Sequence, residues 1–156
     1  MKKIILLVLI LCSTPATLYA DALIYGGIGA GYAESEGSGD AAFGVHIGTG
    51  LVPFVGLEVG FWDFGSFNSF DYSSFYLAAK PSLDLGAVHL FAKLGLNSFD
   101  KDGDRTLSDD GVDLMYGLGA EYFFTDNVSA GASYTSFGFD GEDVSTFTVN
   151  LTFHLL

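Results

Sequence analysis

Strict alternation of apolar and polar residues along most of the chain is the feature that most constrains its fold. In the segment 87–98, Val88 and Leu90 fall on one face while His89 and Lys93 fall on the other. A period of two residues indicates a β-strand, because successive side chains point to opposite faces of a sheet. The same pattern predicts eight strands, at residues 22–34, 40–51, 54–65, 73–84, 87–98, 112–124, 128–139 and 144–155.

The connections between these strands alternate in character. Long, acidic connections are predicted at 35–38, 66–72, 100–111 and 138–143, and short turns at 52–53, 85–86 and 125–127. Long loops on one side and tight turns on the other are typical of outer membrane barrels. Strands of about 12 residues also suit a bilayer crossing, which needs roughly 9–11 tilted residues. The predicted fold class is therefore all-β, an eight-stranded antiparallel up-and-down transmembrane barrel of the outer membrane.

The two faces of the strands differ in chemistry. One face is apolar, and its members include Ile24, Ile28, Val45, Ile47, Leu57, Val59, Leu77, Leu94, Leu118, Val149 and Leu151. The other carries Gly, His, Glu, Lys, Ser, Thr and Asn, so we expect the apolar face to be the outer one. Aromatic residues on the outer face form two predicted girdles, Tyr32, Phe43, Phe61, Phe75, Tyr116, Tyr134 and Phe147 near the long loops and Phe54, Tyr122, Phe124 and Phe153 near the short turns. Such girdles mark membrane interfaces.

The N-terminus has the pattern of a secretory signal peptide. Lys2 and Lys3 precede an apolar run at 4–11, which is far shorter than the roughly 20 residues of a spanning helix. Cleavage is expected after Ala20, and cleavage after Ala22 also fits the sequence. The predicted organisation is a signal peptide at 1–20 and one barrel domain at 21–156.

Removal of residues 1–20 takes away two of the six basic residues and none of the 19 acidic ones, so the net charge of −13 becomes −15. This acidity argues against nucleic acid as a partner, because phosphate neutralisation requires Lys and Arg. Cys12 would lie at the lipid-attachment position of a lipoprotein signal, but the bulky Leu11 before it disfavours that alternative. The chain after residue 20 contains no cysteine.

Four charged residues fall on the polar face near the middle of consecutive strands, Glu58, Lys80, Lys93 and Glu121. An eight-stranded barrel is only wide enough for side chains to fill, and buried charges need partners. We therefore predict an interior ion-pair cluster that plugs the lumen. A pathway for protons or ions through the same residues is the alternative.

The acidic segment 99–111 carries an oxygen-bearing side chain at every second position, namely Asp100, Asp102, Asp104, Thr106 and Ser108. That spacing resembles an EF-hand loop. However, Arg105 stands where the EF-hand has glycine, Gly111 stands where it has glutamate, and both flanks are predicted strands. A looser calcium site on Asp100, Asp102 and Asp104, with Asp109 or Asp110 as a further ligand, is one hypothesis, and a solvated acidic loop without metal is the other. No other cofactor is expected.

Three segments resemble OmpA-like eight-stranded outer membrane proteins: Tyr-Gly-Leu-Gly-Ala-Glu-Tyr-Phe-Phe-Thr-Asp-Asn-Val-Ser at 116–129, Phe-Val-Gly-Leu-Glu-Val-Gly-Phe-Trp-Asp-Phe-Gly at 54–65 and Leu-Phe-Ala-Lys-Leu-Gly-Leu at 90–96. The resemblance implies a monomer in the cell outer membrane with both termini in the periplasm, inserted by the outer-membrane assembly machinery among lipids and lipopolysaccharide. Unlike OmpA, the chain stops at its eighth predicted strand, so no cell-wall tethering is expected. The last residue is Leu156, where the family usually has an aromatic.

Catalytic chemistry is not expected. The three histidines, His46, His89 and His154, all fall on the inner face, and no His-x-Ser pairing of a lipid-modifying enzyme is present. The sequence therefore favours a structural or surface-interaction role, such as membrane integrity or adhesion through acidic loops. A narrow channel for ions or small solutes is the second hypothesis, and a lipid-modifying enzyme is the third.

Overall fold

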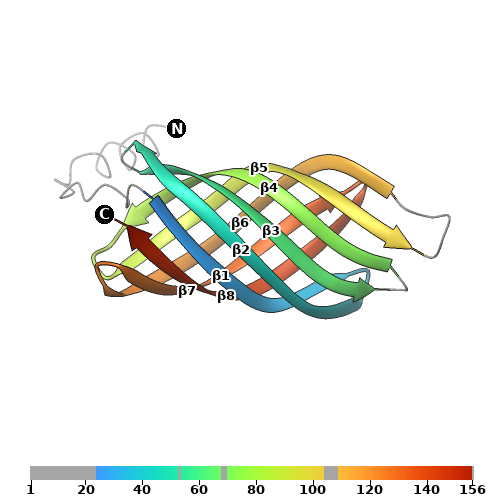
Figure 1. Ribbon diagram of the computed structural model, residues 1–156, viewed down its shortest axis with the longest axis horizontal. Coiled ribbons are helices and arrows are strands. Elements are labelled where there is room, and N and C mark those ends of the chain that lie inside the picture. The colour runs from blue at the N-terminus through green and yellow to red at the C-terminus, as the bar shows by residue number, and fades with distance from the viewer. Residues whose placement is uncertain (1–23, 53, 68–69, 104–108, 156) are drawn as a thin grey trace, which may run out of the picture.

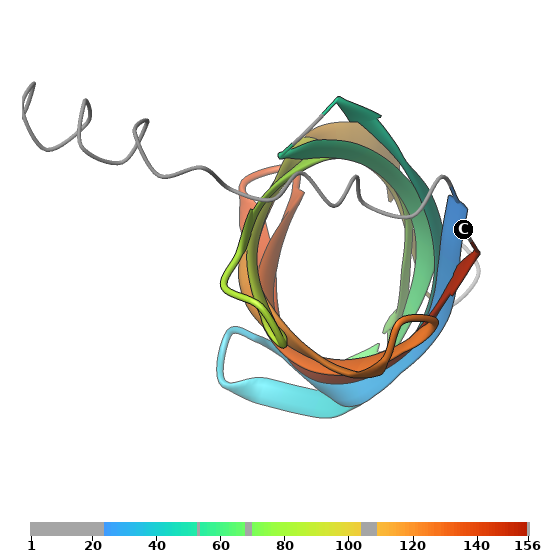
Figure 2. The same cartoon turned by 90° about the vertical axis from the view of Figure 1, so that its left-hand side faces the viewer.

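The computed structural model describes residues 24–52, 54–67, 70–103 and 109–155, and in these ranges the chain forms one closed antiparallel barrel (Figure 1). Each strand pairs with its sequence neighbours, and β1 pairs with β8 to close the ring. Figure 2 shows the ring from one end. The strands are β1 (Ile24–Ser35), β2 (Ser38–Val52), β3 (Val55–Phe67), β4 (Phe70–Asp84), β5 (Val88–Gly103), β6 (Asp109–Thr125), β7 (Val128–Phe139) and β8 (Glu142–Leu155). The predicted eight-stranded barrel is confirmed. No helix in the described ranges is long and apolar enough to cross a membrane.

The barrel has its apolar face outside, as the alternation predicted. All residues of the two predicted girdles are exposed, and so are the predicted apolar outer residues apart from the half-buried Val59. A protein in water would bury such residues, whereas a barrel wall in lipid exposes them between its two interfaces. The outer wall is therefore built for a hydrocarbon environment.

We call the end of the barrel where β1 begins and β8 finishes the basal end, and the opposite end the distal end. At the basal end Ile24 pairs with Leu155, so the first and last strands lie side by side there (Figure 1). Asn127, in the turn between β6 and β7, fastens the end of β8. Its side-chain N–H donates to the carbonyl of His154 at 2.9 Å, and the N–H of His154 donates to the Asn127 carbonyl at 2.8 Å.

The distal connections are shorter than predicted. Glu36 and Gly37 alone join β1 to β2, and Asp140 and Gly141 alone join β7 to β8, because the strands remain paired up to these residues. All four have positive φ, between 48° and 93°. That is the type I′ hairpin turn, which matches strand twist and favours glycine at its second position. The predicted loops at 35–38 and 138–143 were therefore wrong, and the Glu-Gly and Asp-Gly pairs were the missed signal.

The other two predicted distal loops are also shorter. Pairing between β3 and β4 continues to Phe67 and Phe70, and pairing between β5 and β6 continues to Lys101 and Asp109. The strands extend because their inward aromatic side chains at this end are buried, and a paired backbone is the arrangement that brings those side chains together. Asp40, on β2 near this rim, accepts hydrogen bonds from the N–H groups of Ala41 and Ser66, which hold the pKa of its carboxyl below the usual value.

Glycines on the inner face make room for the largest side chains. Trp62 is 5% exposed, and a Cβ atom added at Gly44 would lie 2.4 Å from its ring. A Cβ atom added at Gly29 would lie 2.7 Å from the other edge of the same ring. An indole therefore fits inside this narrow barrel only because two neighbouring strands carry no side chain beside it.

We expect Gly44→Ala to lower the free energy of unfolding by about 1–3 kcal/mol through overpacking against Trp62. Gly26→Ala is the matched control, because a Cβ at Gly26 would have its nearest contact at 3.5 Å, and this variant should be at least as stable as the parent. Urea unfolding in lipid vesicles, followed by the fluorescence of the single tryptophan, measures both. Equal stability of the two variants would contradict the packing argument.

Candidate functional site in the barrel lumen

Glu58 lies at the centre of the polar interior. It is 1% exposed, and its two carboxylate oxygens have four partners. One oxygen, Oε1, lies 2.5 Å from Nζ of Lys93 and accepts a hydrogen bond from the Tyr76 hydroxyl at 2.6 Å. The other, Oε2, accepts one from the Tyr25 hydroxyl at 3.1 Å and lies 3.6 Å from Nζ of Lys80. A buried carboxylate with this many donors is kept ionised.

Lys80 joins Glu58 to the second carboxylate of the cluster. Its Nζ donates to Oε1 of Glu121 at 2.9 Å. The structure thus brings together all four charged residues that the sequence placed on the inner face, from β3, β4, β5 and β6. Two lysines balance two glutamates, so the group, which we call the lumen charge cluster, has no net charge. Each ion is buried but none is left uncompensated.

Phe91 lies beside both lysines of the lumen charge cluster. The Nζ of Lys80 is 4.5 Å from the centre of its ring, and that of Lys93 is 5.5 Å away. Lys80 also lies 4.6 Å from the ring centre of Tyr25. Aromatic faces attract cations at such distances, most strongly where water is excluded. These contacts stabilise the lysines beyond their ion pairs and fill the space around them.

Aromatic side chains fill the distal part of the lumen. We call this group the aromatic plug, and it contains Trp62, Phe64, Tyr72, Tyr76, Phe99, Phe137 and Phe139, packed with Met115 and Val144. The ring centres of Phe64 and Phe137 are 5.0 Å apart, and those of Phe99 and Phe139 are 4.8 Å apart. Each of these side chains is at most 5% exposed. The plug therefore closes the lumen with apolar groups on the distal side of the charges.

The inner face is thus more aromatic than the sequence-based description, which characterised it by glycine, polar and charged residues. The aromatic plug was missed because the alternation was not followed into the distal ends of the strands. Trp62 and Phe64 are at even positions of β3, as Glu58 is, and the same count would have placed them inside. The tyrosines that bind Glu58, Tyr76 on the adjacent strand and Tyr25 two strands away, were also missed, because a contact between strands leaves no local pattern in the sequence.

The histidines belong to the basal half of the lumen. Nε2 of His46 is 3.3 Å from the Thr152 hydroxyl, and Nε2 of His154 is 2.9 Å from the Ser129 hydroxyl. Ser129 also donates to Oε2 of Glu121 at 3.3 Å. In a hydrolytic triad the acid orients the histidine and not the serine. Here Glu121 contacts the serine directly and is paired with Lys80, so the arrangement does not match a hydrolase.

The proposed calcium ligands fall at the distal edge of β5 and beyond it. Asp100 is exposed, only the backbone of Asp102 is described, and Asp104 lies outside the described residues. Among the residues whose side chains are described, no three acidic, histidine or cysteine groups lie close enough to hold a metal ion. The calcium site stays a prediction.

Glu58 and Lys93 should be energetically coupled. We expect Lys93→Met to destabilise the folded barrel by about 3–5 kcal/mol, because it leaves Glu58 with a weakened set of partners in a dry interior. Glu58→Gln with Lys93→Met should cost less than the sum of the two single changes, by about 1–3 kcal/mol. Urea unfolding of the four proteins in vesicles completes this cycle, and additive effects would show that the two residues act independently.

Comparison with known proteins agrees with this architecture. The barrel domain of OprF from Pseudomonas aeruginosa superimposes with a TM-score of 0.63 at 16% identity, covering 85% of this chain and 98% of that one. Neisserial surface protein A gives 0.60 at 19% identity over 85% and 96%. Ail, the attachment invasion locus protein of Yersinia pestis, gives 0.60 at 19% identity over 86% and 97%. These likenesses establish the fold.

No curated protein sequence matches the chain. The family model described as the outer membrane protein beta-barrel domain matches residues 4–154, which is nearly the whole length. Together with the apolar wall and the closed eight-stranded ring, this match assigns the protein to the outer membrane. The chain belongs to the outer membrane protein beta-barrel domain family.

Proposed function

We propose that this protein is a structural and surface-interaction component of the outer membrane, and that its interior is a plug and not a pore. The observation that carries the proposal is the closed lumen. A neutral charge cluster fills its middle, and an aromatic plug fills its distal side. A solute that crossed the barrel would have to displace both layers. A narrow channel for ions or small solutes is the alternative.

The basal end, where β1 begins and β8 finishes, is proposed to face the periplasm, as the family resemblance implies. The distal end then faces the outside of the cell. Two of its connections are two-residue turns, so little of the described chain projects as loops. Surface contacts would therefore be made by the strand ends and the outer wall near the distal girdle. This favours membrane integrity and lipid packing over adhesion through long loops.

Electrical recording in planar bilayers tests the closed lumen. We expect the mature protein, refolded in detergent and shown to be folded by its heat-dependent gel mobility, to produce no steady conductance steps at neutral pH. An open porin recorded in the same bilayers is the positive control. Reproducible steps in the porin range from the folded protein would overturn the proposal and restore the channel hypothesis.

A structural role also predicts a cellular effect. Cells that lack the protein should admit a hydrophobic dye faster than the parent strain, because a plugged barrel contributes to the barrier by its wall and not by transport. Complementation with the parent gene should restore the barrier. A solute-uptake defect with an intact dye barrier would instead indicate transport.

A further inference from the structure

A pocket of about 410 Å³ lies on the outer wall near the distal end, across β7, β8 and β1. It is lined by the aromatic residues Tyr32, Tyr134 and Phe147 and by the carboxylates of Glu34, Glu36 and Asp143, with Ser145 among them. Phe147 pairs with Tyr32 on one side and with Tyr134 on the other, so the three rings belong to one row of the distal girdle. The carboxylates follow on the distal side of that row.

The aromatic walls of this pocket are held in place. The Tyr134 hydroxyl donates to the Ser145 hydroxyl at 2.9 Å. Tyr32 covers Gly39, where an added Cβ would lie 2.2 Å from its hydroxyl oxygen. Rings held in this way lose little side-chain entropy when a ligand binds.

The negative charge of the pocket is not neutralised within the described chain. Lys101 is paired with Glu142 at 3.1 Å, and Lys80 and Lys93 are inside the barrel. No described group of three acidic residues is close enough to hold a metal ion, so the three carboxylates do not form a metal cage in the described residues. Dispersed carboxylates beside aromatic faces suit a larger organic cation, because ammonium groups bind to the faces of tyrosine rings.

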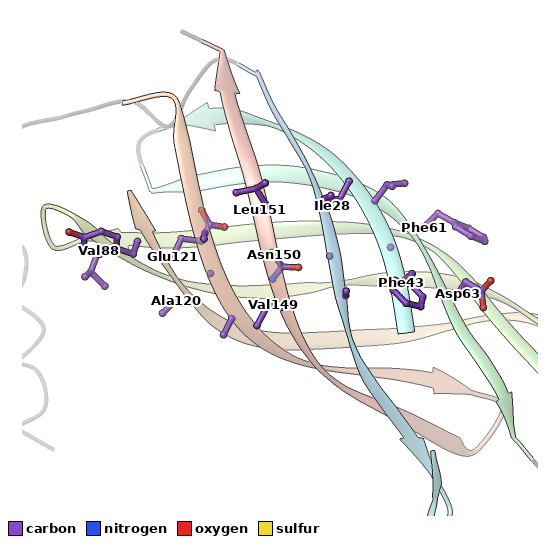
Figure 3. A pocket seen from close by; sticks show the side chains of 18 residues that line it. Ile28, Phe43, Phe61, Asp63, Val88, Ala120, Glu121, Val149, Asn150 and Leu151 are labelled. Atoms are coloured by element: carbon purple, nitrogen blue, oxygen red, sulfur yellow. The ribbon is translucent and has the colours of Figure 1, made fainter. Parts of the chain in front are cut away.

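An apolar groove lies directly on the basal side of the pocket, because its first row of residues adjoins the aromatic row of the pocket. The next row of paired residues is Ala30, Val149 and Ala132, and the row after it is Ile28, Leu151 and Ala130. These rows form the middle of a hollow of about 1060 Å³ that extends around the wall from Phe61 on β3 to Val88 on β5, and Figure 3 shows the labelled Ile28, Val149 and Leu151 on neighbouring strands. Alanines stand beside larger apolar residues in these rows, and an acyl chain is the apolar part of a ligand that such a surface suits.

We propose that the pocket and the groove together bind a lipid whose headgroup carries an ammonium group. The ammonium would contact the rings of Tyr32 and Tyr134 and the carboxylates of Glu34 and Asp143, and the acyl chain would lie along the groove. The site is on the lipid-facing wall and does not depend on the state of the lumen. It names a class of lipid partner that the proposed function leaves open.

Dodecyltrimethylammonium, titrated into the protein in dodecyl maltoside micelles, is the probe. We expect saturable shifts of the ring resonances of isotope-labelled Tyr32 and Tyr134, and contacts between the ring protons and the trimethylammonium protons. Glu34→Gln with Asp143→Asn should weaken binding about five- to tenfold, since each exposed charge contributes modestly. Tyr134→Leu should weaken it, and Tyr134→Phe should retain it because the ring face remains.

The control variant is Asp110→Asn with Asp126→Asn, which changes the net charge equally outside the pocket and should bind like the parent. Loss of binding in this control to the same extent would mean a general attraction to an acidic protein and would overturn the site. Tetramethylammonium without an alkyl chain should bind much more weakly. If it binds as tightly, the ligand is a soluble amine and the lipid proposal fails, and absence of any saturable shift also rejects it. Heat-dependent gel mobility shows that each variant is folded.

Discussion

The rest of the structure depends on the pairing of charges inside a ring too narrow for bulk water. Eight strands enclose a space that side chains must fill, and a charge placed there needs several partners at once. Glu58 has four, which come from β1, β4 and β5. Side-chain contacts therefore join strands that are not hydrogen-bonded neighbours, and the register of the strands that carry the charges is constrained by where those charges must lie.

The interior has two layers, and each is stabilised by a different kind of interaction. The basal half is polar, with histidines, serine and threonine hydroxyls and the lumen charge cluster. The distal half is aromatic and resembles the core of a globular protein. The strands of the distal half stay paired to their ends for this reason, because buried rings stabilise them from within the barrel. The same layer excludes water from the charges and strengthens their interactions.

Much of this was predictable from sequence because a two-residue period directly reports which face a side chain occupies. The number of strands, the outward face and both girdles follow from residues such as Leu94 and Phe147. The alternation also placed Glu58, Lys80, Lys93 and Glu121 inside. It did not predict that the hydroxyls of Tyr25 and Tyr76 bind Glu58, because contacts between side chains of different strands depend on the stagger of those strands. Loop lengths were misjudged because polar, glycine-containing segments such as 35–38 were read as loops when two of their residues suffice for a type I′ turn.

The two-residue hairpins have a practical consequence for protein engineering. At Gly37 and Gly141 a Cβ would meet nothing within 4 Å, so both tips are open to solvent space. The strands that lead to them are already paired, and the aromatic plug holds their distal ends from within. A foreign peptide inserted at either tip would destabilise the barrel mainly by the entropy cost of closing a longer loop, and that cost grows slowly with loop length. The barrel thus offers two rigid, closely defined anchor points for displaying a peptide epitope at one end of a very small membrane scaffold.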